Sequence, residues 1–233
     1  MVLPWGKYNV YVKDLDAASD SGYDWLLLPT PKEQTVAVNP TEGDKLEAKE
    51  EGGGVVDSRR SKSTYEVVYE LFQKKGEAHP LADKTVDGMV IGNYALAIQP
   101  AEDTAVQGIY VGKSTIAAAD SLSSQEGGST AYTHSAVIPL NDSVAKKTIG
   151  GIDHYASLCW KVITAEKKPT GYIDATSGDD GALKVVASGA TAGQINLADV
   201  EPYLGNKTLA ANDYVKLQVG TKFALTFADP GAE

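Results

Sequence analysis

The chain has 233 residues, of which 42% are hydrophobic and 22% are charged, and this balance is typical of a folded globular protein rather than a disordered one. Its formal net charge is −10, which excludes a nucleic-acid-binding protein that neutralises phosphates with one broad basic face. Its single cysteine, Cys159, excludes an intramolecular disulfide, and the apolar run around it predicts a buried thiol.

Strand patterns recur along the whole chain. The clearest covers Thr64–Gln73, where the odd-numbered apolar residues from Tyr65 to Leu71 face one way and the residues between them, two of them glutamates, face the other. The other predicted strands, in chain order, are Tyr8–Lys13, Trp25–Leu28, Thr35–Val38, Met89–Gln99, Gly108–Val111, Thr130–Ile138, Ala156–Thr164, Leu183–Ala187, Tyr214–Val219 and Lys222–Phe227. Short strands separated by turn residues predict an all-β, mainly antiparallel sandwich or open barrel.

Helix and turn signals are few. Residues Asn141–Ile149 predict a short helix with an Asn or Asp cap, and Ala192–Leu204 predicts another turn or two that Pro202 limits. Gly220-Thr221 predicts a two-residue hairpin turn between the last two strands. The Ala, Ser and Gly residues of Ala118–Gly128 predict a flexible loop.

The segment Asn39–Ser63 combines charge blocks with a triple glycine. Residue type alone favours a solvated hairpin or loop, and the alternative is an arm that orders against a neighbouring molecule through opposite charges. For the second case the predicted contact residues are Glu47, Lys49, Glu50, Glu51, Gly52, Gly53, Gly54, Arg59, Arg60 and Lys62.

No motif in the sequence indicates catalysis, a metal or a cofactor. His79, His134 and His154 lack metal-ligand spacing, and His79 before Pro80 indicates a surface loop. A pair of carboxylates for glycoside hydrolysis needs only spatial proximity and stays open. A sugar platform of Trp5, Trp25 and Trp160 also stays open, although their places in or beside strands favour core packing.

The first residues, Met1–Lys7, have no leader pattern, and no apolar run approaches the roughly 20 residues of a membrane helix. We therefore expect the protein to be made and kept in a cytoplasm, without contact with a membrane.

One stretch, from Leu46 to Pro139, resembles bacteriophage tail tube proteins. The resemblance lies in Val55–Gly76, a long strand ending in Phe-Gln-Lys-Lys-Gly, in Asp87–Pro100 with its Asp-Gly-Met-Val-Ile-Gly-Asn-Tyr-Ala-Leu run, and in Gly108–Val111. The residues after Leu140 go beyond the usual extent of that family. We therefore expect a tail-tube-like domain at residues 1–176 with a mobile arm at 39–63, and a C-terminal β extension at 177–233 that completes the sandwich or forms a small domain.

The resemblance implies a structural protein and no enzyme. Such proteins assemble with copies of themselves and with other tail proteins into stacked rings, commonly hexameric, through which DNA passes without sequence-specific binding. They assemble in the bacterial host cytoplasm and then form part of the virion tail, and they need no cofactor. In this chain Thr64–Gln73 and Met89–Gln99 would line the tube or pack behind its wall, and the acidic balance would let DNA slide.

Two other functions compete with this one. An exported carbohydrate-binding or adhesion module of β-sandwich type predicts an exposed aromatic platform. A β-sandwich hydrolase with two catalytic carboxylates predicts a deep acidic cleft.

Overall fold

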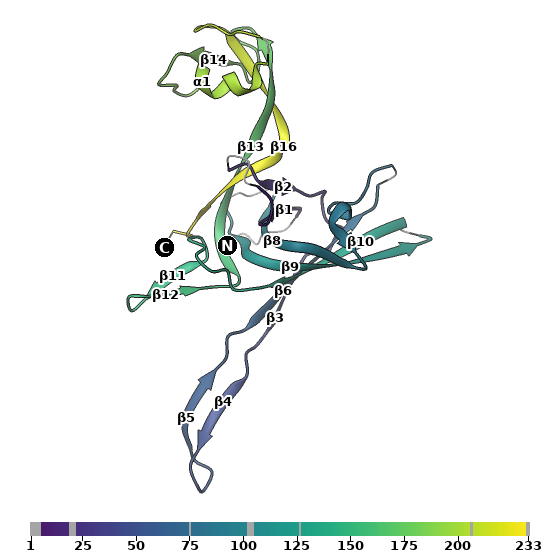
Figure 1. Ribbon diagram of the computed structural model, residues 1–233, viewed down its shortest axis with the longest axis vertical. Helices are drawn as coiled ribbons and strands as arrows, with labels where there is room; N and C mark the ends of the chain where they lie inside the picture. The colour runs from purple at the N-terminus through teal and green to yellow at the C-terminus, as the bar shows by residue number, and fades with distance from the viewer. Residues whose placement is uncertain are drawn as a thin grey trace. The chain divides into compact units, whose positions relative to one another are not determined.

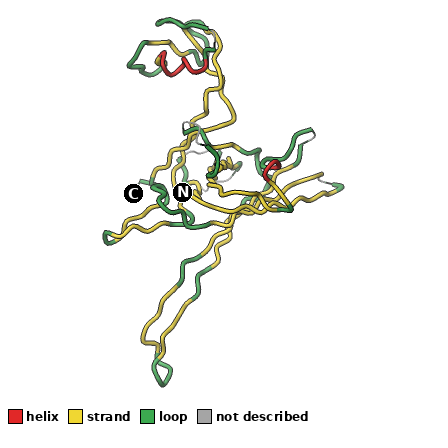
Figure 2. Tube along the Cα trace, viewed as in Figure 1, coloured by secondary structure: helices red, strands yellow, loops and turns green. Residues whose placement is uncertain are grey.

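The protein is described by a computed structural model that covers residues 6–18, 22–74, 76–101, 105–125, 127–205 and 207–231. Strands account for 56% of it and helical residues for 5%, which confirms the all-β prediction (Figure 2). The strands are β1 (Tyr8–Asp14), β2 (Trp25–Leu27), β3 (Ala37–Thr41), β4 (Lys45–Lys49), β5 (Val55–Arg60), β6 (Thr64–Phe72), β7 (Thr85–Val86), β8 (Met89–Pro100), β9 (Gly108–Ser123), β10 (Gly127–Ala136), β11 (Lys146–Ile149), β12 (Ile152–Tyr155), β13 (Cys159–Ala175), β14 (Leu183–Val186), β15 (Gln194–Asn196) and β16 (Tyr214–Ala228). The helical elements are η1 (Ala82–Lys84), α1 (Leu197–Val200) and η2 (Glu201–Tyr203).

The chain forms two compact units. The first contains residues 1–164 and 225–233, and the second contains residues 165–224. This division differs from the expected boundary at residue 177, because β13 and β16 both run from one unit into the other and the end of β16 returns to the first unit.

The first unit is built on a long, mostly antiparallel sheet (Figure 1). Its strands follow the order β2-β1-β8-β9-β10-β6-β3, with β7 paired to β8 and the start of β13 paired to β9. The β9–β10 pair is the most extended, with a register that runs from Gly127 opposite Ser123 to Ala136 opposite Ser114. Two further sheets, β4–β5 and β11–β12, are separate two-stranded hairpins.

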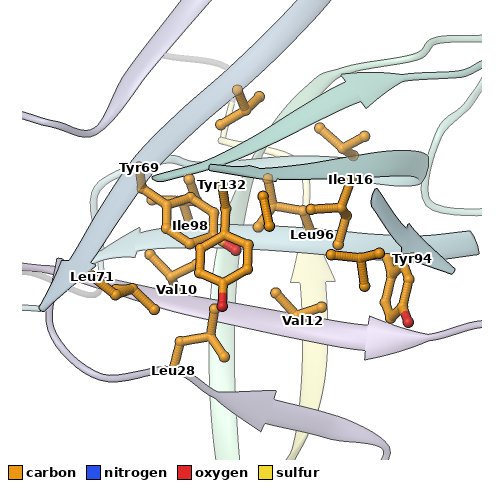
Figure 3. Packing of buried hydrophobic residues seen from close by; sticks show 14 of the residues in the cluster. Val10, Val12, Leu28, Tyr69, Leu71, Tyr94, Leu96, Ile98, Ile116 and Tyr132 are labelled. Carbon is orange, nitrogen blue, oxygen red and sulfur yellow. The ribbon is translucent and has the colours of Figure 1, made fainter. Parts of the chain in front are cut away.

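The main hydrophobic cluster of the first unit lies on one face of this sheet, and on β8 the residues of the other face, such as Ala95 and Ala97, are buried as well. Alternate residues of β6, β8, β9 and β10 point into it, as the period of two in a strand requires. Tyr69 and Tyr132 stack there with ring centroids 5.6 Å apart, and Leu71, Ile98 and Val10 pack around them (Figure 3). The predicted alternation of Thr64–Gln73 is therefore confirmed, since Val67, Tyr69 and Leu71 are its buried residues.

The second unit contains residues 165–175 of β13 and residues 214–224 of β16, together with β14, β15, α1 and η2. Val185, Val200 and Val215 are fully buried in it. The helical turns at Leu197–Tyr203 confirm the prediction made for Ala192–Leu204, where Pro202 sits in the final turn.

The predicted helix at Asn141–Ile149 is wrong. The Asp142 carboxylate accepts a hydrogen bond from the Val144 amide at 2.9 Å, a local bond of the kind that also starts helices. The chain then extends into β11, because Gly150 and Gly151 adopt φ of +60° and +79° and turn it back to pair with β12.

The predicted flexible loop at Ala118–Gly128 is also wrong. Residues 118–123 complete β9, and Gly127 and Gly128 begin β10. Ala and Ser have modest strand propensity, but here each finds a cross-strand partner, and the hydroxyls of Ser121 and Ser129 lie 2.8 Å apart.

No hairpin turn forms at Gly220-Thr221, because β16 continues through both residues. A side chain at position 220 would come within 2.3 Å of Thr170 Cγ2 on β13. The glycine therefore permits close approach of two strands rather than reversal of the chain.

Candidate assembly surface

On β9, β10 and β6 the face opposite the main hydrophobic cluster carries mostly small and polar side chains. We call it the small-residue face. On β9 and β10 its members alternate with buried residues and lie opposite one another in register, and β6 extends it with two carboxylates. The residues of the small-residue face are Thr115, Ala117, Ala119, Ser121, Ser129, Ala131, Thr133, Ser135, Glu66, Val68 and Glu70, and Phe72 lies at its end. The sequence predicted one wet and one packed face for β6, and this is confirmed.

The charged side chains that β6 contributes to this face are both acidic. Glu66 is exposed, and Glu70 is half-buried beside the Lys32 ammonium at 3.6 Å. The loop before β3 also covers the backbone of Glu70, because its amide donates to Thr35 Oγ1 at 3.1 Å and its carbonyl accepts from the Lys32 amide at 2.8 Å. The loop thereby closes the edge of β6 at Glu70, where β3 no longer pairs with it.

The predicted arm is a β-hairpin that continues the β3–β6 pair (Figure 1). Thr41 lies opposite Thr64 in β3–β6, and Lys45 lies opposite Arg60 where the pairing resumes in β4–β5. Between them the Ser61 amide donates to the Asp44 carbonyl at 2.9 Å. A side chain on Gly43 would come within 2.1 Å of the Ser61 carbonyl oxygen, so only glycine fits at this junction. The segment is thus a hairpin in the single chain, and its docking on a neighbouring molecule stays a prediction.

The two faces of the arm differ in character. One face carries Lys45, Glu47 and Lys49, where the Glu47 carboxylate contacts the Lys45 ammonium and lies 3.8 Å from that of Lys49. The other face carries Leu46 and Ala48 opposite Arg59 and Asp57. Arg60 is held at the base of the arm, 2.6 Å from Glu42. Neither Arg59 nor Lys62 has an ion-pair partner among the described residues.

The tip of the arm explains the triple glycine. Gly52 and Gly53 adopt φ of +113° and +88°, which residues with a side chain rarely take. The Glu50 amide donates to the Gly54 carbonyl at 2.9 Å and closes the turn, and Glu51 is exposed within it. A bulge beside Lys49 leaves Val56 outside the regular pairing.

No residue of β4 or β5 is buried. Leu46, Val55 and Val56 are 61%, 50% and 62% exposed, so the arm presents apolar as well as charged groups to solvent. An isolated two-stranded hairpin is marginally stable in water, and this one gains nothing from a core. The chain also has only two arginines, Arg59 and Arg60, and both lie on it. Arginine is enriched at protein interfaces, and both arginines are among the contact residues predicted from the sequence.

A buried serine and histidine elsewhere do not form a catalytic pair. Ser114 Oγ donates to the Tyr94 carbonyl at 2.9 Å, so it must accept from His134 Nδ1, also 2.9 Å away. His134 Nε2 then accepts from the Tyr69 hydroxyl at 3.0 Å. Burial lowers the pKa of His134 to about 3, and each of these hydrogen bonds is satisfied by the neutral ring. The network therefore stabilises the core.

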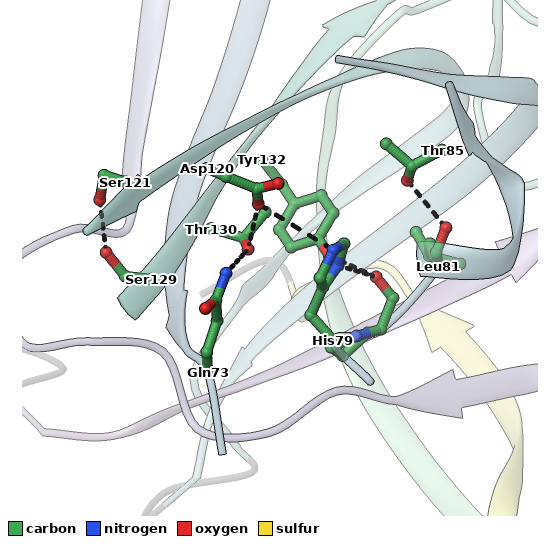
Figure 4. A network of polar contacts seen from close by, with 10 residues as sticks. Gln73, His79, Leu81, Thr85, Asp120, Ser121, Ser129, Thr130 and Tyr132 are labelled. Carbon is green, nitrogen blue, oxygen red and sulfur yellow. Dashed lines mark hydrogen bonds and ion pairs between the residues drawn. The ribbon is translucent and has the colours of Figure 1, made fainter. Parts of the chain in front are cut away.

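A second histidine ties a loop to the end of the sheet (Figure 4). His79 Nδ1 lies 2.9 Å from the Tyr132 hydroxyl, which donates to the Pro80 carbonyl. His79 Nε2 lies 4.0 Å from Asp120, whose carboxylate accepts from Thr130 at 2.7 Å. His79 lies in a loop as expected, but its ring is half-buried because Tyr132 covers it.

Trp25 and Trp160, the two tryptophans among the described residues, do not form a shared platform. Trp25 is 5% exposed and packs against Tyr110 and Phe227 at centroid distances of 6.3 and 6.0 Å, which confirms core packing for this residue. Trp160 is 55% exposed, so the core prediction is wrong for it, and Trp5 lies outside the described residues. Cys159 beside it is half-buried rather than buried, because it starts β13 next to an exposed position, and burial still raises its thiol pKa.

Trp160 borders an apolar hollow of about 150 Å³ that Tyr8, Ile98 and Pro100 also line. A larger open hollow of about 580 Å³ is lined by Ala105, Gln107, Val162, Pro230 and Gly231, with no carboxylate side chain among these five. Within the described residues, no cluster of His, Cys, Asp and Glu is arranged to hold a metal ion. The helices of the described chain are all too short to span a bilayer.

Neither the family models nor the curated protein sequences with which the chain was compared match it.

Proposed function

We propose that this protein is a structural building block whose copies assemble into stacked rings forming a tube, as in phage tails. It acts through geometry, without catalysis and without a cofactor. The β4–β5 arm, including Glu47, Lys49, Glu50, Glu51, Gly52, Gly53, Gly54, Arg59, Arg60 and Lys62, binds a neighbouring copy, and the small-residue face lines the conduit for DNA.

The observation that carries this proposal is the fully exposed arm. It projects Leu46, Val56 and both arginines of the chain into solvent. Docking against another copy would bury its apolar side chains and pair the Arg59 guanidinium with a carboxylate through charge-assisted hydrogen bonds, two terms that favour association.

The small-residue face supports the second half of the proposal. Ala117, Ala119 and Thr133 form a strip of small side chains on this face. The exposed Glu66 carboxylate beside this strip adds negative charge, whereas the Glu70 carboxylate is paired with Lys32. A negative wall repels the phosphates of DNA, which suits passage rather than binding.

The experiment compares the wild type with the double variant Arg59→Glu, Arg60→Glu. We expect rings or tubes of the wild type by negative-stain microscopy and light scattering at high concentration, and a folded monomer for the variant. The control, Lys7→Glu with Lys167→Glu, makes the same change in charge at exposed sites away from the arm and should assemble normally. A wild type that stays monomeric at all concentrations would overturn the proposal, and normal tubes from the arm variant would remove the arm from it.

One observation favours a second candidate function, a carbohydrate-binding or adhesion module. Trp160 is exposed beside Tyr8 and Pro100, and exposed aromatic rings provide stacking surfaces for sugars. A glycan-array signal that Trp160→Ala abolishes would favour this function over assembly.

A further inference from the structure

The β11–β12 hairpin has an apolar tip that the proposed arm contact does not use. Ile149 and Ile152 flank the Gly150-Gly151 turn and are 57% and 64% exposed. Lys147 lies opposite His154 on the same face, one step from Ile149 in the alternation of the strand. The tip therefore presents two isoleucines with basic groups behind them.

This hairpin is not covered by its own chain. Every residue of β11 and β12 is exposed except Tyr155, which is half-buried. On the other face Lys146 and Thr148 bond the Asp153 carboxylate at 2.7 and 2.8 Å, so the acidic group of the hairpin is already occupied. Lys147 has no ion pair within the described part of the chain.

A second exposed apolar patch lies where β7 meets β8, at the border of the small-residue face, because Met89 lies opposite Ala117. Val86 pairs with Met89 across a tight turn, and Ile91 follows two residues later on the same face. These residues are 54%, 61% and 58% exposed, whereas Val90 between them is buried. Asp87 is exposed within the turn at φ of +48°, so a carboxylate borders the patch.

The two patches complement each other in both apolar area and charge. One has two isoleucines with Lys147 behind them, and the other has three apolar side chains with Asp87 beside them. Opposite charges at the border of an apolar contact fix its register and speed its formation. Both surfaces are exposed in a single copy, so the contact they fit is one between two copies.

We propose that the β11–β12 tip of one copy docks on the Val86–Met89–Ile91 patch of a second copy, with Lys147 against Asp87. This inference rests on the proposed function, because it supplies a contact between copies that differs from the arm. The contact is heterologous, with different surfaces on the two partners, so it repeats from copy to copy and closes into a ring or continues as a filament.

Engineered cysteines test the contact directly. Ile152→Cys and Met89→Cys are made separately in a Cys159→Ser background, mixed at high concentration and oxidised. We expect a cross-linked dimer containing one chain of each kind. Leu122→Cys, at another exposed hairpin tip, replaces Ile152→Cys in the control, and Val56→Cys tests whether the arm occupies the patch instead. Cross-linking of Met89→Cys that is no greater with Ile152→Cys than with either of these would overturn the inference.

A charge exchange provides the second test. Lys147→Glu and Asp87→Lys should each weaken association about tenfold, equivalent to about 1.4 kcal/mol, and together should restore it. Sedimentation velocity gives the readout. If the wild type assembles and the exchange has no effect, this contact is wrong and the proposed function stands. If the wild type never associates and never cross-links, both fail.

Discussion

The ribbon formed by residues 37–72 has two halves that differ in what covers them. In the β3–β6 half, Val67, Tyr69 and Leu71 are buried against the core, and the loop at Lys32–Thr35 closes the edge beside Glu70. In the β4–β5 half no residue is buried, although the same two chain segments continue in the same antiparallel pairing. The difference teaches that pairing alone shapes a strand, whereas burial of one face makes it stable.

Composition explains why the two halves part at Gly43. In β6 apolar side chains occupy every second position, so one face is suited to a core. In β4 and β5 charged residues occupy both faces of the hairpin. Burial of either face against the same core would remove charged side chains from water, which is energetically costly. The β4–β5 surface contains both acidic and basic side chains, so it can form opposite-charge pairs with a second copy of the same chain.

The largest effect is expected from truncating a core residue in the β3–β6 half. Tyr69→Ala should lower the free energy of unfolding by about 3–5 kcal/mol, because it removes a fully buried ring that packs against Tyr132 and His134. Leu46→Ala on the arm should change it by less than about 0.5 kcal/mol. Urea unfolding of the monomer measures both, and equal losses would contradict the contrast between the halves.

An intermediate effect is expected from His134→Gln, which replaces the buried ring of the hydrogen-bond network. It should cost about 1–3 kcal/mol at pH 7, since Tyr69 and Ser114 lose well-placed partners. The folded pKa of His134 is about 3 and its ordinary value is 6.5, so below pH 6.5 the unfolded wild type binds a proton that the folded state does not. The stability of the wild type therefore falls with acid.

The advantage of the wild type over His134→Gln should shrink by up to about 1.4 kcal/mol for each pH unit below 6. Carboxylates titrate in both proteins and cancel in the difference. Urea unfolding at several pH values from 7 to 4 measures it, and a gap that stays constant across this range would show that His134 is not a buried neutral group.

The smallest effect on global stability is expected at the junction of the two halves. Gly43→Ala should disrupt the contact with Ser61 and loosen β4–β5 while the core stays intact, because the added carbon meets backbone that must move. Hydrogen exchange should show lost protection in the arm alone. The control Gly54→Ala meets only the flexible Glu50 side chain and should leave the junction unchanged. Lost protection throughout β6 in the Gly43 variant would mean that the halves are coupled.

Strand positions could be predicted from the sequence wherever apolar residues alternate or cluster. Each predicted strand overlaps an observed one, from β1 at Tyr8 to β16 at Phe227. The errors fall where a residue serves neighbours distant in the sequence. Gly220 predicted a turn because of its residue type, whereas in the structure it allows the close approach of Thr170 on the neighbouring strand. The Ala and Ser residues at the end of β9 predicted a loop, whereas in the structure they pair with β10.

The candidate arm was located by its charge blocks and glycines, and its ten predicted contact residues all lie on the arm or at its base. Its hairpin form depends on the pairing register of β4 and β5, which could not be predicted from the sequence. The patch at Val86, Met89 and Ile91 could not be predicted, since the same residues in another sheet would face a core.

The sequence by itself determined the strand-rich character of the chain, its acidic charge, the period of two in β6 and the charged segment at its start. These are properties of neighbouring residues, and local alternation and composition record them. Only the tertiary structure decided which face of each strand is covered, which hairpins stay uncovered and that β16 returns to the first unit. Burial depends on contacts between residues far apart in the chain, and no local pattern specifies them.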